Sequence, residues 1–166
     1  MGQYYKPIIL GEDSYIRIWI EVFDCGLKMM EHAYCDSPLM HKIEYLLSNR
    51  GMMYKTRVVW AGDYADNEPN SEKNLYTLAE ETSQPFNIVL PLDFIPYRFI
   101  VNHTKKQYVE KLCDIHPLPI LTAEGNGRGG GDYHGDSDYV GAWARDVISV
   151  ENDEPNGYTK LVLQKP

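Results

Sequence analysis

The sequence predicts an α+β fold: a single domain over residues 1–166 with a mostly antiparallel sheet, one clear helix and a second short helix. Side chains alternate between apolar and polar over residues 15–23 (YIRIWIEVF), which is typical of a strand with one face in the core. Apolar side chains then recur at helical spacing over residues 38–49. A chain of 166 residues also suits one domain, since domains usually run to roughly 100–200 residues.

The first part of the chain is expected to form strands. Residues 4–10 are a short apolar run that ends at Gly11, and residues 15–23 follow as the alternating strand. The turn residues Asp24-Cys25-Gly26 then predict a hairpin. We therefore expect residues 27–33 to return as its second strand.

The clear helix has sequence signals at both ends. Ser37 can cap its first turn, and Pro38 suits the first helical position, where the missing N–H costs nothing. Gly51 is placed to end it. The apolar stripe consists of Leu39, Met40, Ile43, Leu46 and Leu47.

The rest of the chain alternates short apolar runs with turn residues. Strands are predicted over residues 56–61, 97–101, 107–112, 147–150 and 158–163. A short helix is predicted over residues 74–81, after a polar loop, and Pro85, Pro91 and Pro96 exclude a long helix in the stretch that contains them. Because most connections are short, we expect a largely antiparallel sheet with helices on one face.

Charge and composition restrict the partners. The formal charge is −8, so direct binding to a nucleic-acid backbone is not expected, whereas a basic protein surface is approached more easily. An acidic balance can equally serve solubility alone. No apolar stretch approaches the ~18–20 residues of a membrane helix, and the N-terminus has no signal-peptide pattern. Three cysteines without that pattern predict reduced thiols and a cytoplasmic protein.

The glycine-rich segment EGNGRGGGDYHGDSDYVG is the least ordinary part of the sequence, with seven of the 13 glycines between Gly125 and Gly141. Consecutive amide groups without side chains can converge on an anion, and an arginine can add a planar donor. A surface loop made of tight turns is the alternative. The candidate ligand-binding residues are Asn126, Arg128, Gly129, Gly130, Asp132 and His134.

The same segment offers carboxylates to a hard cation, through Asp132, Asp136 and Asp138. The order of residues in a calcium-binding EF-hand is missing, so solvated carboxylates are the alternative. Asp63 and Asp66 directly follow an apolar strand, where catalytic carboxylates and ordinary turns both occur. Since no standard nucleophile, zinc or nucleotide motif is present, the sequence leaves the catalytic residues and the cofactor unidentified.

Four segments together resemble a family of uncharacterised small proteins from bacteria and their phages. They are MGQYYK at the start, RVVWAGDYAD (57–66), VNHTKKQYV (101–109) and GNGRGGGDYHG (125–135). The resemblance carries no activity or catalytic residue with it. It implies a cytoplasmic setting in a bacterium or a mobile element.

Two functions are therefore expected. The first is an acidic binding protein that acts on a host protein, for example an anti-defence inhibitor of the anti-CRISPR type, which would fit the small size and the charge of −8. The alternative is a ligand-binding or enzymatic domain that binds a nucleotide, a phosphate compound or a metal through residues 125–138. The sequence predicts no particular oligomeric state.

Overall fold

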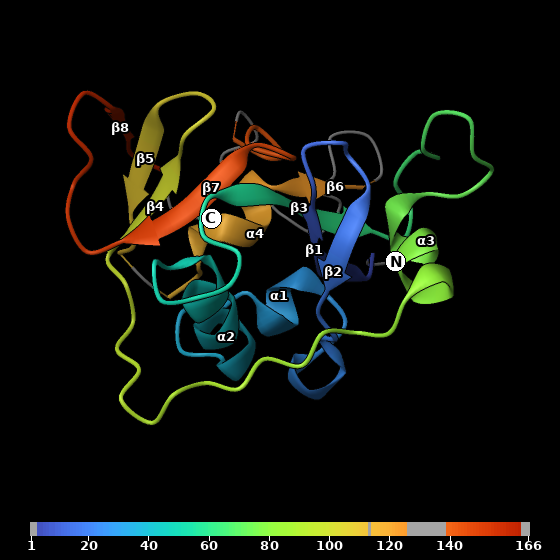
Figure 1. Cartoon of the computed structure of the whole chain (residues 1–166), viewed down its shortest axis with the longest axis horizontal. Helices are drawn as coiled ribbons and strands as arrows, with labels where there is room; N and C mark the ends of the chain where they lie inside the picture. Colours follow the sequence, from blue (N-terminus) through green and yellow to red (C-terminus); the bar gives the residue numbers. More distant parts are fainter. Residues whose placement is uncertain (1–2, 113, 126–138, 164–166) are drawn as a thin grey trace.

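The computed structural model describes residues 3–112, 114–125 and 139–163. They form a mixed α/β structure around one eight-stranded sheet (Figure 1). The strands are β1 (Tyr5–Leu10), β2 (Ile16–Trp19), β3 (Thr56–Gly62), β4 (Phe99–Asn102), β5 (Gln107–Glu110), β6 (Ala123–Glu124), β7 (Val147–Glu151) and β8 (Thr159–Leu161). The helices are α1 (Met29–His32), α2 (Pro38–Leu47), α3 (Leu75–Thr82) and α4 (Pro117–Leu121), with a 3-10 turn η1 (Phe23–Cys25).

The sheet is largely antiparallel, as predicted, but it is not purely so. The strand order is β2-β1-β3-β7-β4-β5-β8, and β6 adds to β3 beyond the point where β7 leaves it. β5 pairs with β8 in parallel, and β3 pairs with β6 in parallel. All other pairs are antiparallel, including β4 with β5, which correspond to the strands predicted over residues 97–101 and 107–112.

Helices cover both faces of the sheet, so the expectation of helices on one face is wrong. Val58 and Trp60 of β3 point into the larger core, which contains the apolar side of α2 and most of α4. Val59 and Ala61 point the other way, into a smaller core closed by Leu75 and Ala79 of α3. The sequence predicted a short helix over residues 74–81, but not which face of the sheet it covers.

Helix α2 forms as the sequence predicts. The Ser37 hydroxyl accepts a hydrogen bond from Met40 N at 3.1 Å, and Pro38 occupies the first turn. The helix ends at Leu47, two residues before the predicted end, because Ser48 takes an extended backbone and its hydroxyl donates to the Tyr45 carbonyl at 2.7 Å. Gly51 then packs against the end of the helix, and its N–H donates to Ser48 O at 3.0 Å.

The predicted hairpin over residues 15–33 is wrong in its second half. Strand β2 stops at Trp19, η1 follows, and residues 29–32 form helix α1 instead of a strand. The helix is favoured locally, since the Glu31 carboxylate accepts a hydrogen bond from Lys28 N at 3.0 Å. Met29 and Ala33 are then buried in the larger core.

Helix α4 and strand β6 were not predicted. Pro117 and Pro119 conceal α4 in the sequence, yet both fit into a first helical turn. The His116 ring caps this helix, because its Nδ1 accepts a hydrogen bond from Leu118 N at 3.2 Å. The whole of α4 is buried.

The cysteines differ from the prediction of three reduced thiols. Cys35 is disulfide-bonded, whereas Cys25 is a free thiol. The spacing of the cysteines in the sequence gave no sign of the disulfide, because Cys35 is positioned by contacts with residues far along the chain. Its backbone N–H donates a hydrogen bond to Asp114 O at 2.9 Å.

None of the described helices is long and apolar enough to cross a membrane.

Gly51 tests the end of α2. A Cβ at this position would collide with the carbonyl oxygens of Tyr45 and Leu46, which belong to the helix backbone and cannot move aside easily. We expect Gly51→Ala to lower the free energy of unfolding by about 1–3 kcal/mol in urea denaturation. The exposed neighbour Asn49 is the control, and Asn49→Ala should change it by less than about 0.5 kcal/mol. Equal stability of the two variants would contradict this packing.

Candidate functional site

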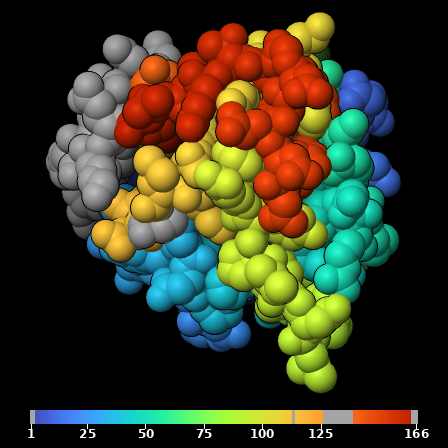
Figure 2. Space-filling model, turned by 90° about the vertical axis from the view of Figure 1, so that its left-hand side faces the viewer, coloured from blue at the N-terminus to red at the C-terminus, as the bar shows by residue number. Residues whose placement is uncertain are grey.

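A long connection without helix or strand joins α3 to β4 over residues 83–98, and we call it the strap. It runs past α1 and α2 along one end of the molecule (Figure 1). In the view of Figure 2 the strap, in yellow-green, projects from the lower edge of the body. Structureless connections of more than roughly 12–15 residues are uncommon in compact domains and are often functional.

The strap is fixed at its start by Trp19 of β2. The indole Nε1–H of Trp19 donates to Ser83 O at 3.2 Å, and Phe86 N donates to Trp19 O at 2.7 Å. Ile88 then enters the larger core and is only 6% exposed. These contacts hold the first part of the strap against the edge of the sheet.

A buried lysine, Lys6, packs against the ring of Trp19. The ammonium of Lys6 lies 4.3 Å from the centre of the Trp19 ring and 3.8 Å from that of Tyr76, and it forms an ion pair with Glu80 at 2.7 Å. Burial lowers the pKa of Lys6, and the Glu80 carboxylate partly offsets this effect. Since Glu80 belongs to α3, the same ammonium ties α3 to the sheet just before the strap begins.

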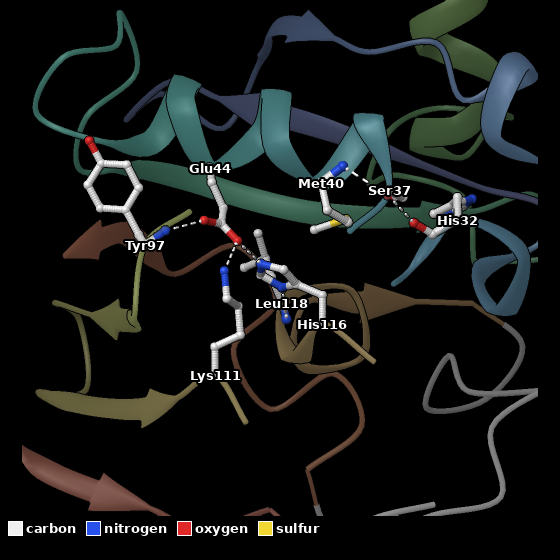
Figure 3. Close-up of polar contacts among 8 residues, drawn as sticks. All are labelled: His32, Ser37, Met40, Glu44, Tyr97, Lys111, His116 and Leu118. Atoms are coloured by element: carbon white, nitrogen blue, oxygen red, sulfur yellow. Dashed lines mark hydrogen bonds and ion pairs between the residues drawn. The ribbon is translucent and has the colours of Figure 1, made fainter. Parts of the chain in front are cut away.

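The far end of the strap is fixed by Glu44 of α2, whose side chain is completely buried. One carboxylate oxygen accepts a hydrogen bond from Tyr97 N, in the strap, at 2.7 Å (Figure 3). The other oxygen accepts hydrogen bonds from Lys111 Nζ at 2.6 Å and from His116 Nε2 at 2.8 Å. One carboxylate thus joins α2, the strap, the end of β5 and the start of α4.

The protonation states follow from these contacts. Leu118 N donates to His116 Nδ1, so that nitrogen carries no proton, and Nε2 must carry the one it donates to Glu44. Burial lowers the pKa of His116 and keeps the ring neutral. Burial alone would raise the pKa of Glu44, but the hydrogen bond from His116 and the charge of Lys111 outweigh it and lower that pKa. The buried charged pair is therefore Glu44 with Lys111.

Between its anchors the strap exposes three aliphatic side chains, which we call the ridge: Val89 (78% exposed), Leu92 (107%) and Ile95 (76%). Leu92 stands at the corner of a turn closed by a hydrogen bond from Phe94 N to Pro91 O at 3.1 Å.

Residues next to the ridge in the strap make aromatic and charged contacts with the body of the protein. The ring of Phe94 packs on His41 of α2 and on Tyr97, with ring centres 5.4 and 6.3 Å apart. The exposed Asp93 pairs with Arg50 at 3.2 Å. The strap thus presents apolar side chains from a backbone that buried and aromatic contacts hold in place, and such preorganisation lowers the entropic cost of binding.

In two other polar clusters of the described residues, the side chains bond to one another. The Ser149 hydroxyl lies 2.7 Å from His103 Nε2 but donates to Glu151 at 2.6 Å, so it is not activated as a nucleophile by the histidine, and it is fully buried. In another cluster, Arg145 binds the carboxylates of Glu68 and Glu124, each through two hydrogen bonds. Over residues 3–112, 114–125 and 139–163, no group of His, Cys, Asp and Glu could hold a metal.

The residues predicted from the glycine-rich segment lie outside the described part of the chain. These are the ligand candidates Asn126, Arg128, Gly129, Gly130, Asp132 and His134 and the metal candidates Asp132, Asp136 and Asp138.

The two other predicted carboxylates are described. Asp63 has structural partners, since its side chain accepts a hydrogen bond from Tyr4 N at 3.0 Å and its carbonyl accepts one from the Asn74 side chain at 3.0 Å. Asp66 is exposed in the irregular connection after β3. The strap and Glu44 were missed, although Pro85, Pro91 and Pro96 among apolar residues were a signal for an exposed, irregular segment.

Comparison with known proteins gives no match to a family model, to a curated protein or to a solved structure. The resemblance to small bacterial and phage proteins therefore stays a hypothesis.

The buried histidines predict how stability depends on pH. Burial lowers the pKa of both His32 and His116 below the ordinary value of 6.5. Below pH 6.5 the unfolded chain therefore binds protons that the folded chain does not, and the free energy of unfolding falls as the pH falls. We expect a loss of up to about 1 kcal/mol per pH unit for each of the two, in urea denaturation between pH 7 and pH 5.

The variant His116→Gln, which can still donate to Glu44, should lose less stability over this range than the wild type. A stability that is constant or rises towards pH 5, or a variant with the wild-type slope, would contradict a neutral His116.

Proposed function

We propose that the protein is a binding module that acts on a host protein and contacts it through the ridge on the strap. The observation that supports this most is the exposure of Val89, Leu92 and Ile95 on a backbone fixed by Trp19 and Glu44. Exposed apolar side chains gathered on one segment are typical of protein–protein contacts. Leu92, at the corner of the turn, is suited to fill an apolar pocket of the partner.

The charge of the chain indicates the chemistry around that pocket. With a formal charge of −8 the protein is attracted to a basic surface, and such attraction speeds up encounter. Asp93, next to Leu92, keeps a side chain that is 75% exposed and places one carboxylate beside the apolar contact. A basic surface that normally holds nucleic acid, as in a CRISPR effector, has this chemistry, and covering it would block the host protein. A membrane with anionic lipids would repel the chain instead.

An inhibitor of this kind acts in the cytoplasm, where thiols are normally kept reduced. The proposal therefore requires binding to persist when the Cys35 disulfide is reduced. Trp19 and Glu44 hold the strap by hydrogen bonds, and neither of these anchors includes the disulfide. Binding is accordingly measured in the presence of dithiothreitol.

The test begins with a photoreactive amino acid at position 92, in a lysate of the host bacterium. The crosslinked protein is identified, purified and titrated with three forms of the chain: the wild type, Leu92→Asp and Val162→Asp. Val162 is the matched control, because it is also an exposed aliphatic residue (69%) but lies outside the strap. We expect Leu92→Asp to weaken binding at least tenfold, which corresponds to about 1.4 kcal/mol, while Val162→Asp changes it less than twofold.

Binding should also weaken as salt is raised, because charge attraction is screened. Thermal melting of each variant shows that it is folded, and exposed positions should melt like the wild type. If Leu92→Asp binds as tightly as Val162→Asp, or if the identified partner is acidic and binds without salt dependence, the proposed function is wrong.

A further inference from the structure

We infer that Asn156 is a site of spontaneous deamidation that changes the turn before β8. This inference is independent of the proposed function, since it concerns the loop between β7 and β8 and not the strap. The sequence there is Asn156-Gly157, and both residues are exposed in the middle of a turn.

The geometry leaves the reacting groups accessible. A Cβ built at Gly157 would meet no atom within 4 Å apart from its chain neighbours, so the space on that side of the residue is open. Among the described residues, neither the Gly157 N–H nor the Asn156 side chain has a hydrogen-bond partner. Gly157 has φ of +81°, a conformation that glycine adopts without strain and other residues rarely take. The nucleophile and the amide that it attacks are thus both unprotected.

The reaction is balanced with water as its only co-reactant. The Gly157 nitrogen gives up its proton and forms a bond to Cγ of Asn156. The bond from Cγ to the side-chain nitrogen breaks, and ammonia leaves with the proton. The resulting succinimide is opened by water at either carbonyl, which gives aspartate or isoaspartate, and no atom is oxidised or reduced.

The product alters an exposed acidic loop. It adds a negative charge beside Asp153 and Glu154, and Glu154 accepts a hydrogen bond from the Tyr108 hydroxyl. Isoaspartate also inserts one more carbon into the main chain, two residues before Tyr158, whose hydroxyl lies 3.0 Å from His103 Nδ1. Strand β8 has only three residues and, among the described strands, pairs only with β5, so it depends on the length of this turn.

The test is peptide mapping by mass spectrometry after incubation of the native protein at pH 8 and 37 °C. We expect conversion at Asn156, with isoaspartate as a product, while the exposed Asn152 in the same loop stays unchanged because Asp153 follows it. Hydrogen exchange at residues 159–161 should be faster in the aged protein. In Asn156→Gln, aged in parallel, neither change should appear.

Two results would overturn the inference. One is an Asn156 that stays intact in the folded protein while the same site in the urea-unfolded chain reacts, since the fold would then protect it. The other is faster exchange of residues 159–161 in aged Asn156→Gln as well, since ageing would then loosen β8 by another route.

Discussion

The structure depends most on one buried carboxylate. Glu44 is fully buried, and its two oxygens accept hydrogen bonds from the strap, from the end of β5 and from the start of α4. A buried charge is tolerated only when such partners surround it, and removing one partner of a buried pair typically costs about 3–5 kcal/mol. Glu44 therefore requires Tyr97, Lys111 and His116 to be in place together. The packing of α2 and the path of the strap are linked by this requirement.

This link explains how an irregular segment can serve as a binding surface. The strap has no ladder of backbone hydrogen bonds, yet Trp19 holds its start and Glu44 its end. Both anchors involve buried polar groups, and Lys6 in turn supports Trp19 by lying over its ring. The aliphatic ridge is exposed on a segment that is held at both ends. The proposed function rests on this combination of exposure and fixation, together with the formal charge of −8.

Local patterns in the sequence predicted the elements that are stabilised locally. Helix α2 has its cap, its proline and its apolar stripe within a few residues, and β4 and β5 form a hairpin across a short turn. Helix α4 was missed because Pro117 and Pro119 are more typical of a loop than of a helix. The Glu44 cluster could not be predicted, because Lys111 and His116 lie 67 and 72 residues further along the chain. Only the fold brings these three residues together. In the sequence, the three prolines of the strap indicated an irregular segment, but nothing indicated the carboxylate that holds its end.

The most direct test of this account is the mobility of the strap in the wild-type protein, measured by 15N relaxation. If Trp19 and Glu44 fix the strap, the backbone order parameters of residues 86–97 should be close to those of α2, at about 0.85. The amides of Val89, Leu92 and Ile95 are the decisive ones, because their side chains are exposed and the contacts of neighbouring residues must hold this part of the backbone. Order parameters below about 0.6 along the ridge would show a flexible loop and would contradict a preorganised binding surface.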